Sequence, residues 1–340
     1  MKKSISLVSL VSPVILKTAK RILLAGLCAL LLFSLGSCGP ADTGRGYVKD
    51  IVVVATNKNQ TKAIFNIMQE KGFLREELPE GVSLQWSEIS GFANIRDGLV
   101  AGQVDFVSTT GSGMIVSIEN GYPILPIANS MGASAAIYSN NPEIATAADI
   151  EKAKTIGLNS LAGSYQYAFN KFEEREYGDA TKLDARFIVL EFEDMMASLR
   201  TSRDLDVAIV AFPSTIDADQ VETLTKIVDL TPIIEEYALG NFVFSSEKFV
   251  KENPALVEAF LRAERRAIDY MNQNRAEAAQ LLSGLYSIEA SYIEAELAKF
   301  PPSIALKAYD STARFLWELG ELEKEPKKFD TFLNYETIPQ

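Results

Sequence analysis

Short apolar runs recur along this chain and predict buried strands that alternate with helices. The first run, residues 51–56, reads Ile-Val-Val-Val-Ala-Thr and is typical of a parallel strand buried on both faces. Apolar residues at helical spacing follow over residues 63–68, and the pattern stops near Gly72. Similar strands are predicted at residues 82–86 and 104–108, each followed by a helix. This alternation indicates βαβ units around a parallel sheet.

A second series with the same alternation begins after Asn140, Asn141 and Pro142. It comprises predicted strands at residues 155–158, 187–190 and 207–210 and predicted helices at residues 165–177 and 194–200. In both series a helix is followed by an aspartate that opens a buried strand, Asp105 in the first and Asp206 in the second. This weak internal similarity suggests a duplicated architecture with two lobes.

The last third of the chain is predicted to be helical. Asn253 followed by Pro254 is typical of a helix start, with an N-cap residue and then proline at the first helical position. In the residues that follow, the spacing places apolar side chains on one face of a helix and charged side chains on the opposite face, as in a surface helix. Further helices are predicted at residues 276–282, 288–298 and 311–322.

The first 37 residues are predicted to be a targeting segment and not a domain, because they contain five basic residues and no acidic one. Residues 22–35 form an uncharged, mostly apolar run. A bilayer-spanning helix needs about 20 apolar residues, so this shorter run fits the core of a signal peptide. An additional apolar run at residues 5–16 leaves open whether translation starts further downstream.

The apolar core ends in Leu35, Gly36, Ser37 and Cys38, which together resemble the bacterial lipobox. There, a signal peptidase cuts before a cysteine whose thiol has been diacylated. The resemblance implies a lipid anchor at Cys38 and a mature chain that starts there. The alternative is a secretory signal followed by a chance cysteine.

Composition narrows the classes of function. Removing the five basic residues of the targeting segment from the 33 in the chain leaves 28 against 45 acidic residues, which makes nucleic acid a poor partner. Histidine is absent, which excludes His-based acid–base catalysis and His-containing metal sites. Cys28 lies in the segment that would be removed, so no disulfide is expected. We expect no cofactor, no metal and no catalytic residue.

Several motifs resemble the nitrate/sulfonate/taurine-type solute-binding proteins of ABC importers, a family that also includes receptors for thiamine-precursor pyrimidines. Residues 99–106, Leu-Val-Ala-Gly-Gln-Val-Asp-Phe, look like the family's ALxxGxVDF element. Residues 120–124 resemble its NGxPL turn, residues 148–157 its DLKGKKIG element, and residues 249–257 its FxxxxPxLVxAF helix. The resemblance covers residues 51–282 and rests on the order and spacing of these motifs.

The resemblance implies an α/β fold of the type II periplasmic-binding-protein kind. Two lobes, each a mostly parallel sheet flanked by helices, would be joined by crossovers near residues 130–136 and 239–244. The expected organisation is a signal peptide at residues 1–37, a linker at 38–49, a first lobe at 50–132 plus 241–340, and a second lobe at 133–240. The C-terminal helices would pack on the first lobe.

The resemblance also implies a function. We expect an extracytoplasmic, membrane-anchored lipoprotein, in the periplasm or at the cell surface, which binds a sulfonate, a pyrimidine or a related heterocycle between its lobes. Hinge closure would follow, and the closed monomer would dock on ABC permease subunits. One alternative is an enzyme related to thiamine-pyrimidine synthases, but those use an active-site histidine and a cysteine-rich stretch. Another is a lipoprotein sensor or adhesin that reuses the fold.

The candidate ligand contacts lie in the loops after the strands, because ligands of open parallel sheets bind beyond the carboxyl ends of the strands. Amide side chains and small polar segments before helices suit an anion or a carbonyl oxygen there. The same residue types are also ordinary helix caps. These candidates are Asn57, Gln60, Ser90, Gly91, Thr110, Gly111, Ser112, Gly163 and Ser164.

Acidic and aromatic residues add a second group of candidates. Glu191 follows a predicted strand, and its carboxylate either pairs with a nitrogen of the ligand or belongs to an acidic helix start capped by Asp194. Phe192 and Phe212 lie at strand ends, where an aromatic ring can stack on a flat ligand. A carboxylate in the cleft favours an amino-bearing or heterocyclic solute over a simple sulfonate or nitrate.

Overall fold

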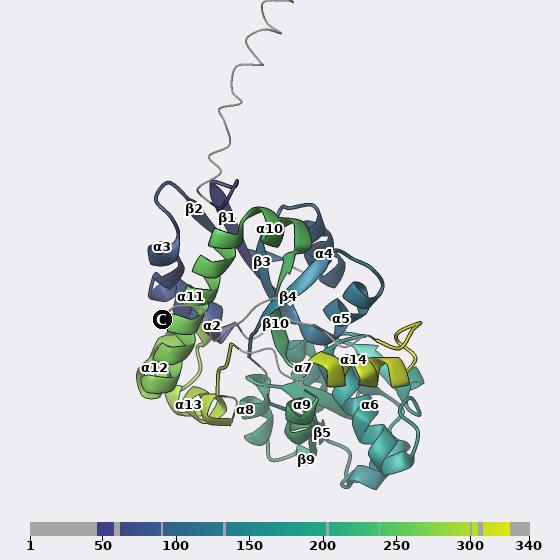
Figure 1. Ribbon diagram of the computed structural model, residues 1–340. Helices are drawn as coiled ribbons and strands as arrows, with labels where there is room; N and C mark the ends of the chain where they lie inside the picture. The colour runs from purple at the N-terminus through teal and green to yellow at the C-terminus, as the bar shows by residue number, and fades with distance from the viewer. Residues whose placement is uncertain are drawn as a thin grey trace, which may run out of the picture. The chain divides into compact units, whose positions relative to one another are not determined.

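The structure is a computed structural model of the 340-residue chain (Figure 1). It describes residues 46–57, 62–89, 91–131, 134–201, 204–237, 239–299, 301–304 and 309–326. Residues from Lys49 onward belong to one compact unit. The predicted signal peptide, Cys38, Gln60 and Ser90 lie outside the described residues. Within the described ranges, no helix combines the length and the apolarity that a membrane span requires.

The first sheet has five strands in the spatial order β2-β1-β3-β10-β4. They are β1 (Ile51–Asn57), β2 (Ser83–Ile89), β3 (Phe106–Thr110), β4 (Ile124–Asn129) and β10 (Asn241–Ser246). β1 pairs in parallel with β2 and β3, whereas β10 runs antiparallel to β3 and β4. Val52, Val54 and Phe106 are fully buried, as the apolar runs predicted.

The helices that come after these strands along the chain pack around the first sheet. They are α2 (Ala63–Glu70), α3 (Phe73–Glu77), α4 (Phe92–Val100), α5 (Gly111–Glu119), α10 (Glu247–Glu252), α11 (Pro254–Gln273) and α12 (Arg275–Tyr286). α11 packs on α2 and α3, and its Phe260 ring stacks on Phe106 with 4.1 Å between ring centroids. The apolar face predicted after Pro254 is therefore the face that covers the sheet.

The second sheet also has five strands, in the order β7-β6-β8-β5-β9. They are β5 (Ala135–Ser139), β6 (Ile156–Leu158), β7 (Phe187–Val189), β8 (Val207–Ala211) and β9 (Thr225–Asp229). Its helical segments are η1 (Ala147–Lys152), α6 (Ser164–Tyr177), η2 (Asp184–Arg186), α7 (Phe192–Thr201), α8 (Ser214–Asp219) and α9 (Thr231–Glu236). Tyr138, Met195, Leu199 and Val210 form part of one buried cluster under this sheet.

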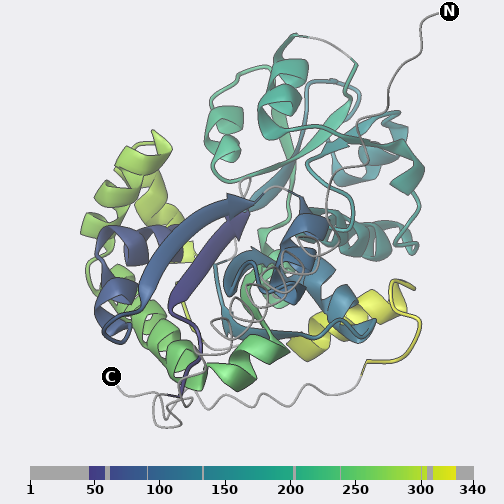
Figure 2. The same cartoon turned by 90° about the horizontal axis from the view of Figure 1, so that it is seen from above.

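The two sheets repeat one topology, which Figure 2 shows as two separate groups of strands. In each, the fourth strand of the spatial order is antiparallel to its neighbours: β10 in the first sheet and β5 in the second. In each, that strand is the first one after the chain arrives from the other sheet. The prediction of two mostly parallel sheets is confirmed, while the exact lobe boundaries stay a prediction.

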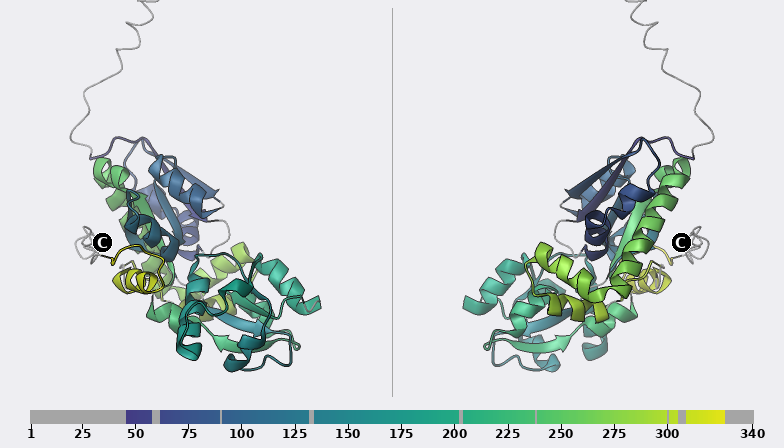
Figure 3. Two further views of the ribbon diagram at one scale, coloured as in Figure 1. Left: turned by 90° about the vertical axis from the view of Figure 1, so that its right-hand side faces the viewer. Right: turned by 90° about the vertical axis from the view of Figure 1, so that its left-hand side faces the viewer.

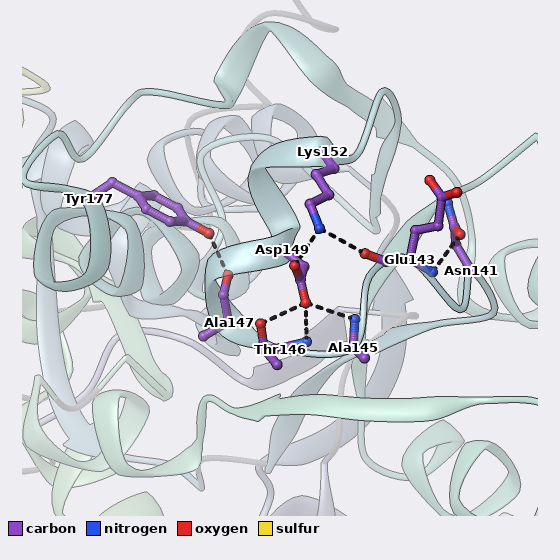
Figure 4. A network of polar contacts seen from close by, with 8 residues as sticks. All are labelled: Asn141, Glu143, Ala145, Thr146, Ala147, Asp149, Lys152 and Tyr177. Atoms are coloured by element: carbon purple, nitrogen blue, oxygen red, sulfur yellow. Dashed lines mark hydrogen bonds and ion pairs between the residues drawn. The ribbon is translucent and has the colours of Figure 1, made fainter.

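The segment that leads into β6 is held by one carboxylate (Figure 4). Asp149 Oδ2 accepts hydrogen bonds from the Thr146 backbone N–H at 2.9 Å and from its hydroxyl at 2.6 Å. Lys152 Nζ lies 2.6 Å from Asp149 Oδ1, and the Tyr177 hydroxyl donates to the Ala147 carbonyl at 2.7 Å. Asp149 thus caps η1 and tethers it to the surrounding chain, within the predicted motif at residues 148–157.

The last two helices, α13 (Ala290–Lys299) and α14 (Tyr309–Glu318), contact elements of both sheets (Figure 3). Glu296 of α13 accepts hydrogen bonds from the backbone N–H of Ser134 at 2.6 Å and from its hydroxyl at 2.8 Å. Ser134 immediately precedes β5 on the crossover from the first sheet. α14 packs on α5, and its Phe315 ring lies 5.1 Å from the ring of Tyr237, just after α9.

Candidate functional site

A pocket of about 640 Å³ opens between loops of the first sheet and loops of the second. Its size suits a small organic molecule. The side of the first sheet supplies Gly91, Phe92, Arg96, Thr110, Gly113, Val116, Ser117, Asn120 and Tyr122. The side of the second sheet supplies Asn159, Ser160, Leu161, Ala162, Gly163, Tyr167 and Glu191, and Glu321 comes from the segment after α14.

The two halves touch directly beside this pocket. Thr110 Oγ1, at the end of β3, lies 2.7 Å from Ser164 Oγ, at the start of α6. Ser112, in the first turn of α5, lies 3.2 Å from the same Thr110 oxygen. The predicted residues Thr110, Ser112 and Ser164 are therefore brought together, and the N-termini of α5 and α6 lie side by side.

The N-terminal residues of three helices line the pocket: Gly91 before α4, Thr110 before α5 and Gly163 before α6. None of these three described N-caps makes a side-chain capping hydrogen bond. The first N–H groups of a helix have no partner inside the helix, and the helix dipole places partial positive charge there. Together these starts favour an anionic or carbonyl group in the pocket.

Close packing surrounds the glycines in two of these loops. A Cβ on Gly111 would lie 2.9 Å from the ring of Phe242, because the Gly111 N–H donates to the Gly240 carbonyl at 3.0 Å. A Cβ on Gly163 would lie 2.6 Å from Ser160 Oγ. The packed Phe242 ring leaves no room for a side chain at position 111, whereas at position 163 a rotation of the Ser160 hydroxyl would relieve the contact.

Arg96, on α4, is a pocket residue that sequence reasoning missed. Its guanidinium carbon lies 4.5 Å from the centre of the Tyr122 ring, and its Nε donates to Asp97 Oδ1 at 2.8 Å. The aromatic ring and the carboxylate hold the guanidinium in one orientation, which is the geometry that favours recognition of an acidic group. In the sequence, a single arginine on a helix is indistinguishable from a solvated surface residue.

The acidic and aromatic candidates take different positions. Glu191 lines the pocket, and its carbonyl accepts the Met195 N–H at 2.9 Å, which is the first helical hydrogen bond of α7. Phe192 lies outside the lining, with its ring at 6.2 Å from that of Tyr165 in an edge-to-face arrangement. Phe212 is buried, and its N–H donates to the Ser134 carbonyl at 2.8 Å.

The remaining candidates are less informative. Gly111 is buried beside Phe242 and is absent from the lining, while Asn57 ends β1 with a side chain outside the described part of the chain. Tyr167 and Glu321 are among the other lining residues that the prediction missed, and they come from the first turn of α6 and from the segment after α14. In the described ranges, no three Asp, Glu, Cys or His side chains are placed to hold a metal ion.

Several solved structures share this fold. The alkanesulfonate-binding protein SsuA from Xanthomonas axonopodis pv. citri, bound to MOPS, superposes with a TM-score of 0.66 and 16% identity, over 82% of this chain and 96% of that one. SsuA from Escherichia coli, a periplasmic aliphatic sulphonate binding protein, gives 0.65 and 18%, over 82% and 95%. The periplasmic nitrate-binding protein NrtA from Synechocystis PCC 6803 gives 0.60 and 14%, over 81% and 83%.

These superpositions confirm the predicted periplasmic-binding-protein fold, with two sheets flanked by helices. A search by sequence among curated proteins returns no significant match. The family described as NMT1/THI5 like matches residues 59–278, more than half of the chain. This range covers nearly all of residues 51–282, over which the sequence motifs resemble the solute-binding proteins. The chain therefore belongs to the NMT1/THI5-like family.

Proposed function

We propose that this protein is the solute-binding component of an ABC importer and that it binds a small organic solute with an acidic group in the pocket between its two halves. The observation that carries the proposal is the set of three helix N-termini that line this pocket together with Arg96. Backbone N–H groups, helix dipoles and a guanidinium all favour negative charge at one place.

The names of the structural relatives support the same class of solute. The Xanthomonas protein is described as alkanesulfonate-binding and holds MOPS, which is itself a sulfonate, and NrtA is described as nitrate-binding. We propose that this chain shares their role as a receptor outside the cytoplasm and that it is not an enzyme, because its sequence has no histidine for the acid–base chemistry of the related synthases. Heterocyclic acids and pyrimidines stay within the proposed range of solutes.

Binding would close the two halves by rotation about the two segments that cross between the sheets. The first crossover joins β4 to β5 and the second joins α9 to β10. The contact of Thr110 with Ser164 at 2.7 Å supports a closed arrangement of the pocket loops. The closed form would then dock on the permease subunits as a monomer.

The first experiment measures the thermal shift of purified protein with MOPS, ethanesulfonate and nitrate at millimolar concentrations. A ligand present at 100 times its Kd stabilises the folded state by about 2.7 kcal/mol, which a melting curve resolves. We expect at least one sulfonate to raise the Tm of the unmodified protein and to do so much less in Arg96→Gln. Lys152→Gln is the control, because Lys152 is absent from the pocket lining and pairs with Asp149, and this variant keeps the full shift.

Mass spectrometry of solute extracted from freshly purified protein complements this panel. An extracted small organic acid supports the proposal, whatever its exact structure. Absence of any solute, together with no shift from any acid, would overturn it.

We propose that the mature chain is attached to a membrane through lipid on Cys38. The support is the order of basic flank, apolar core and small residues before the cysteine. Cys38→Ser should move the protein from the membrane fraction to the soluble fraction of the cell envelope. Retention of the variant in the membrane fraction would contradict the anchor and would leave the binding proposal untouched.

A further inference from the structure

We propose that Tyr167 and Glu321 form a subsite in this pocket for a positively charged or N–H-bearing nitrogen group of the solute. The inference rests on the proposed binding function and adds a second chemical requirement to it. Nothing in the sequence places these two residues together, because they lie in different parts of the chain, one in α6 and the other after α14. Their meeting depends on α14.

α14 is fixed to both halves of the molecule. On the side of the first sheet, it packs on α5, and the Tyr309 hydroxyl donates to Glu119 Oε1 at 3.4 Å. On the side of the second sheet, the Thr312 hydroxyl donates to the Tyr237 carbonyl, and Lys171 Nζ lies 5.2 Å from the centre of the Phe315 ring. Figure 1 shows α14, in yellow, between α5 and α6. The helix thus leads the chain to Glu321, which lines the pocket.

The end of α14 holds Glu321 in place. The chain turns at Gly320, whose φ of 82° is a left-handed conformation that favours glycine. The Glu321 N–H donates to the Leu316 carbonyl at 2.9 Å, as in a helix-terminating turn. Leu322, the next residue, is buried. The backbone of Glu321 is therefore anchored on both sides, while its side chain lines the pocket.

Tyr167 supplies the observation that points to a ligand. Its side chain is 0% exposed and lines the pocket, and its hydroxyl lies close to the Glu321 carboxylate without forming a hydrogen bond of normal geometry to it or to any other described residue. A buried hydroxyl without a hydrogen bond destabilises the folded state, so proteins seldom keep one without a use. A bound solute would provide the missing partner.

The chemistry of the pair selects the group that binds. Burial and the nearby Glu321 carboxylate raise the pKa of Tyr167, so it stays a neutral hydroxyl. A carboxylate and a phenol oxygen can both accept hydrogen bonds from an ammonium or amidine group, with charge assistance from the carboxylate. Glu191 adds a second carboxylate to the same lining, whereas Arg96 is its basic residue. A solute with an acidic end for Arg96 and a nitrogen-bearing end for Glu321 matches these charges.

The test uses two sulfonates that differ by one ammonium group, 3-aminopropanesulfonate and 1-propanesulfonate, and measures both affinities by calorimetry. We expect the unmodified protein to bind the amino compound at least tenfold more tightly. Glu321→Gln should bring the two affinities within about twofold, and Tyr167→Phe should weaken the amino compound alone. Glu325→Gln is the matched control, because Glu325 lies in the same segment, pairs with Arg314 at 3.3 Å and is absent from the lining.

A second pair, butylamine and 1-butanol, separates this subsite from the proposed acid-binding function. If only the amine raises the Tm of the unmodified protein, and Glu321→Gln abolishes that shift, the subsite stands even where no sulfonate binds. Equal affinity for both sulfonates, or a tenfold preference retained by Glu321→Gln, overturns the subsite and leaves the binding function intact. No response to either nitrogen-bearing probe also overturns it. Tyr167→Phe should melt at the same or a higher temperature without ligand, since it removes an unpartnered hydroxyl.

Discussion

Each sheet has an aspartate at an equivalent position, just before one of its parallel strands, but the two aspartates are buried to different degrees. In the first sheet, Asp105 precedes β3, and its Oδ2 accepts the Val53 N–H of β1 at 2.8 Å. In the second sheet, Asp206 precedes β8, and its Oδ2 accepts the N–H groups of Lys154 and Thr155, before β6, at 2.7 and 3.3 Å. In both, a carboxylate ties the start of one parallel strand to the neighbouring strand.

The surroundings of the two carboxylates differ. The side chain of Asp105 is 1% exposed, and its second oxygen lies 2.5 Å from Lys49 Nζ. Burial raises the pKa of Asp105, although Lys49 and the Val53 N–H act in the opposite direction. Asp206 is only partly buried. The repeated sequence signal thus predicts the hydrogen bond, whereas the degree of burial depends on what the rest of the chain packs over it.

Replacing these two aspartates should have the largest effect on the free energy of unfolding among the substitutions considered. Asp105→Ala should lower the free energy of unfolding by about 3 kcal/mol, because it leaves the Val53 N–H without its acceptor and breaks the ion pair between the buried Asp105 carboxylate and Lys49. Asp206→Ala should cost about 1 to 2 kcal/mol, since water can replace the carboxylate at a partly exposed site. Urea denaturation followed by tryptophan fluorescence measures both.

Asp105→Asn and Asp206→Asn are the controls, because an amide oxygen retains one acceptor at each site. Both should cost less than the alanine variants. Equal losses for the two alanine variants would contradict the role assigned to burial.

The sequence predicted the strands that are apolar throughout, and it failed where the chain crosses between sheets. β1, β3 and β8 are nearly continuous β-branched or apolar runs, so their positions followed from the pattern. β4 contains Pro126 and β9 is polar and half-exposed, so neither matched the pattern of a buried strand. β5 and β10 begin inside the predicted crossovers at residues 130–136 and 239–244 and extend beyond them, and their antiparallel pairing depends on contacts with the other strands of each sheet.

The candidate site shows the same limit. The rule that ligands lie beyond the carboxyl ends of parallel strands selected loops that do line the pocket, including Gly91, Thr110 and Gly163. It could not select Arg96, whose direction depends on the rotation of α4, or Glu321, which depends on the return of α14. Residues next to strand ends are thus accessible to sequence reasoning, and residues brought in by tertiary packing are not.

Buried glutamates offer a second comparison of the two halves. Glu264, on α11 of the first half, is 0% exposed, and its two carboxylate oxygens have no hydrogen-bond partner among the described residues. Glu173, on α6 of the second half, is equally buried but accepts the Leu183 N–H at 2.7 Å and an Asn170 N–H at 3.3 Å. Glu264→Leu should therefore stabilise the protein by about 1 to 2 kcal/mol, and Glu173→Leu should destabilise it by about 1 to 3 kcal/mol.

The pH dependence of stability sharpens this second comparison. Burial raises the pKa of Glu173 to about 8 and that of Glu264 well above its ordinary value. The folded state then holds these protons more tightly than the unfolded state, so the stabilisation that these two groups contribute is greatest below about pH 4.5 and falls as the pH rises toward 8. Glu173→Gln and Glu264→Gln should each flatten this fall in urea denaturation at pH 5, 6.5 and 8. An unchanged slope in both variants would contradict the buried, protonated state.

The smallest expected effect concerns Asp149, whose side chain is 22% exposed, whereas that of Asp105 is 1% exposed. Lys152 and Thr146 lower the pKa of Asp149, in the network that leads the chain into β6. A depressed folded-state pKa stabilises the protein above the ordinary pKa near 4 and loses that contribution as the pH falls. Asp149→Ala should thus lower the Tm slightly at pH 7, and the difference from the unmodified protein should shrink steadily from pH 4 to pH 3. Solvent screens an ion pair that is partly exposed, so Asp149→Ala should lower the Tm less than Asp105→Ala does. An equal loss of Tm at pH 7 would contradict the role assigned to burial in setting the contribution of each aspartate to stability.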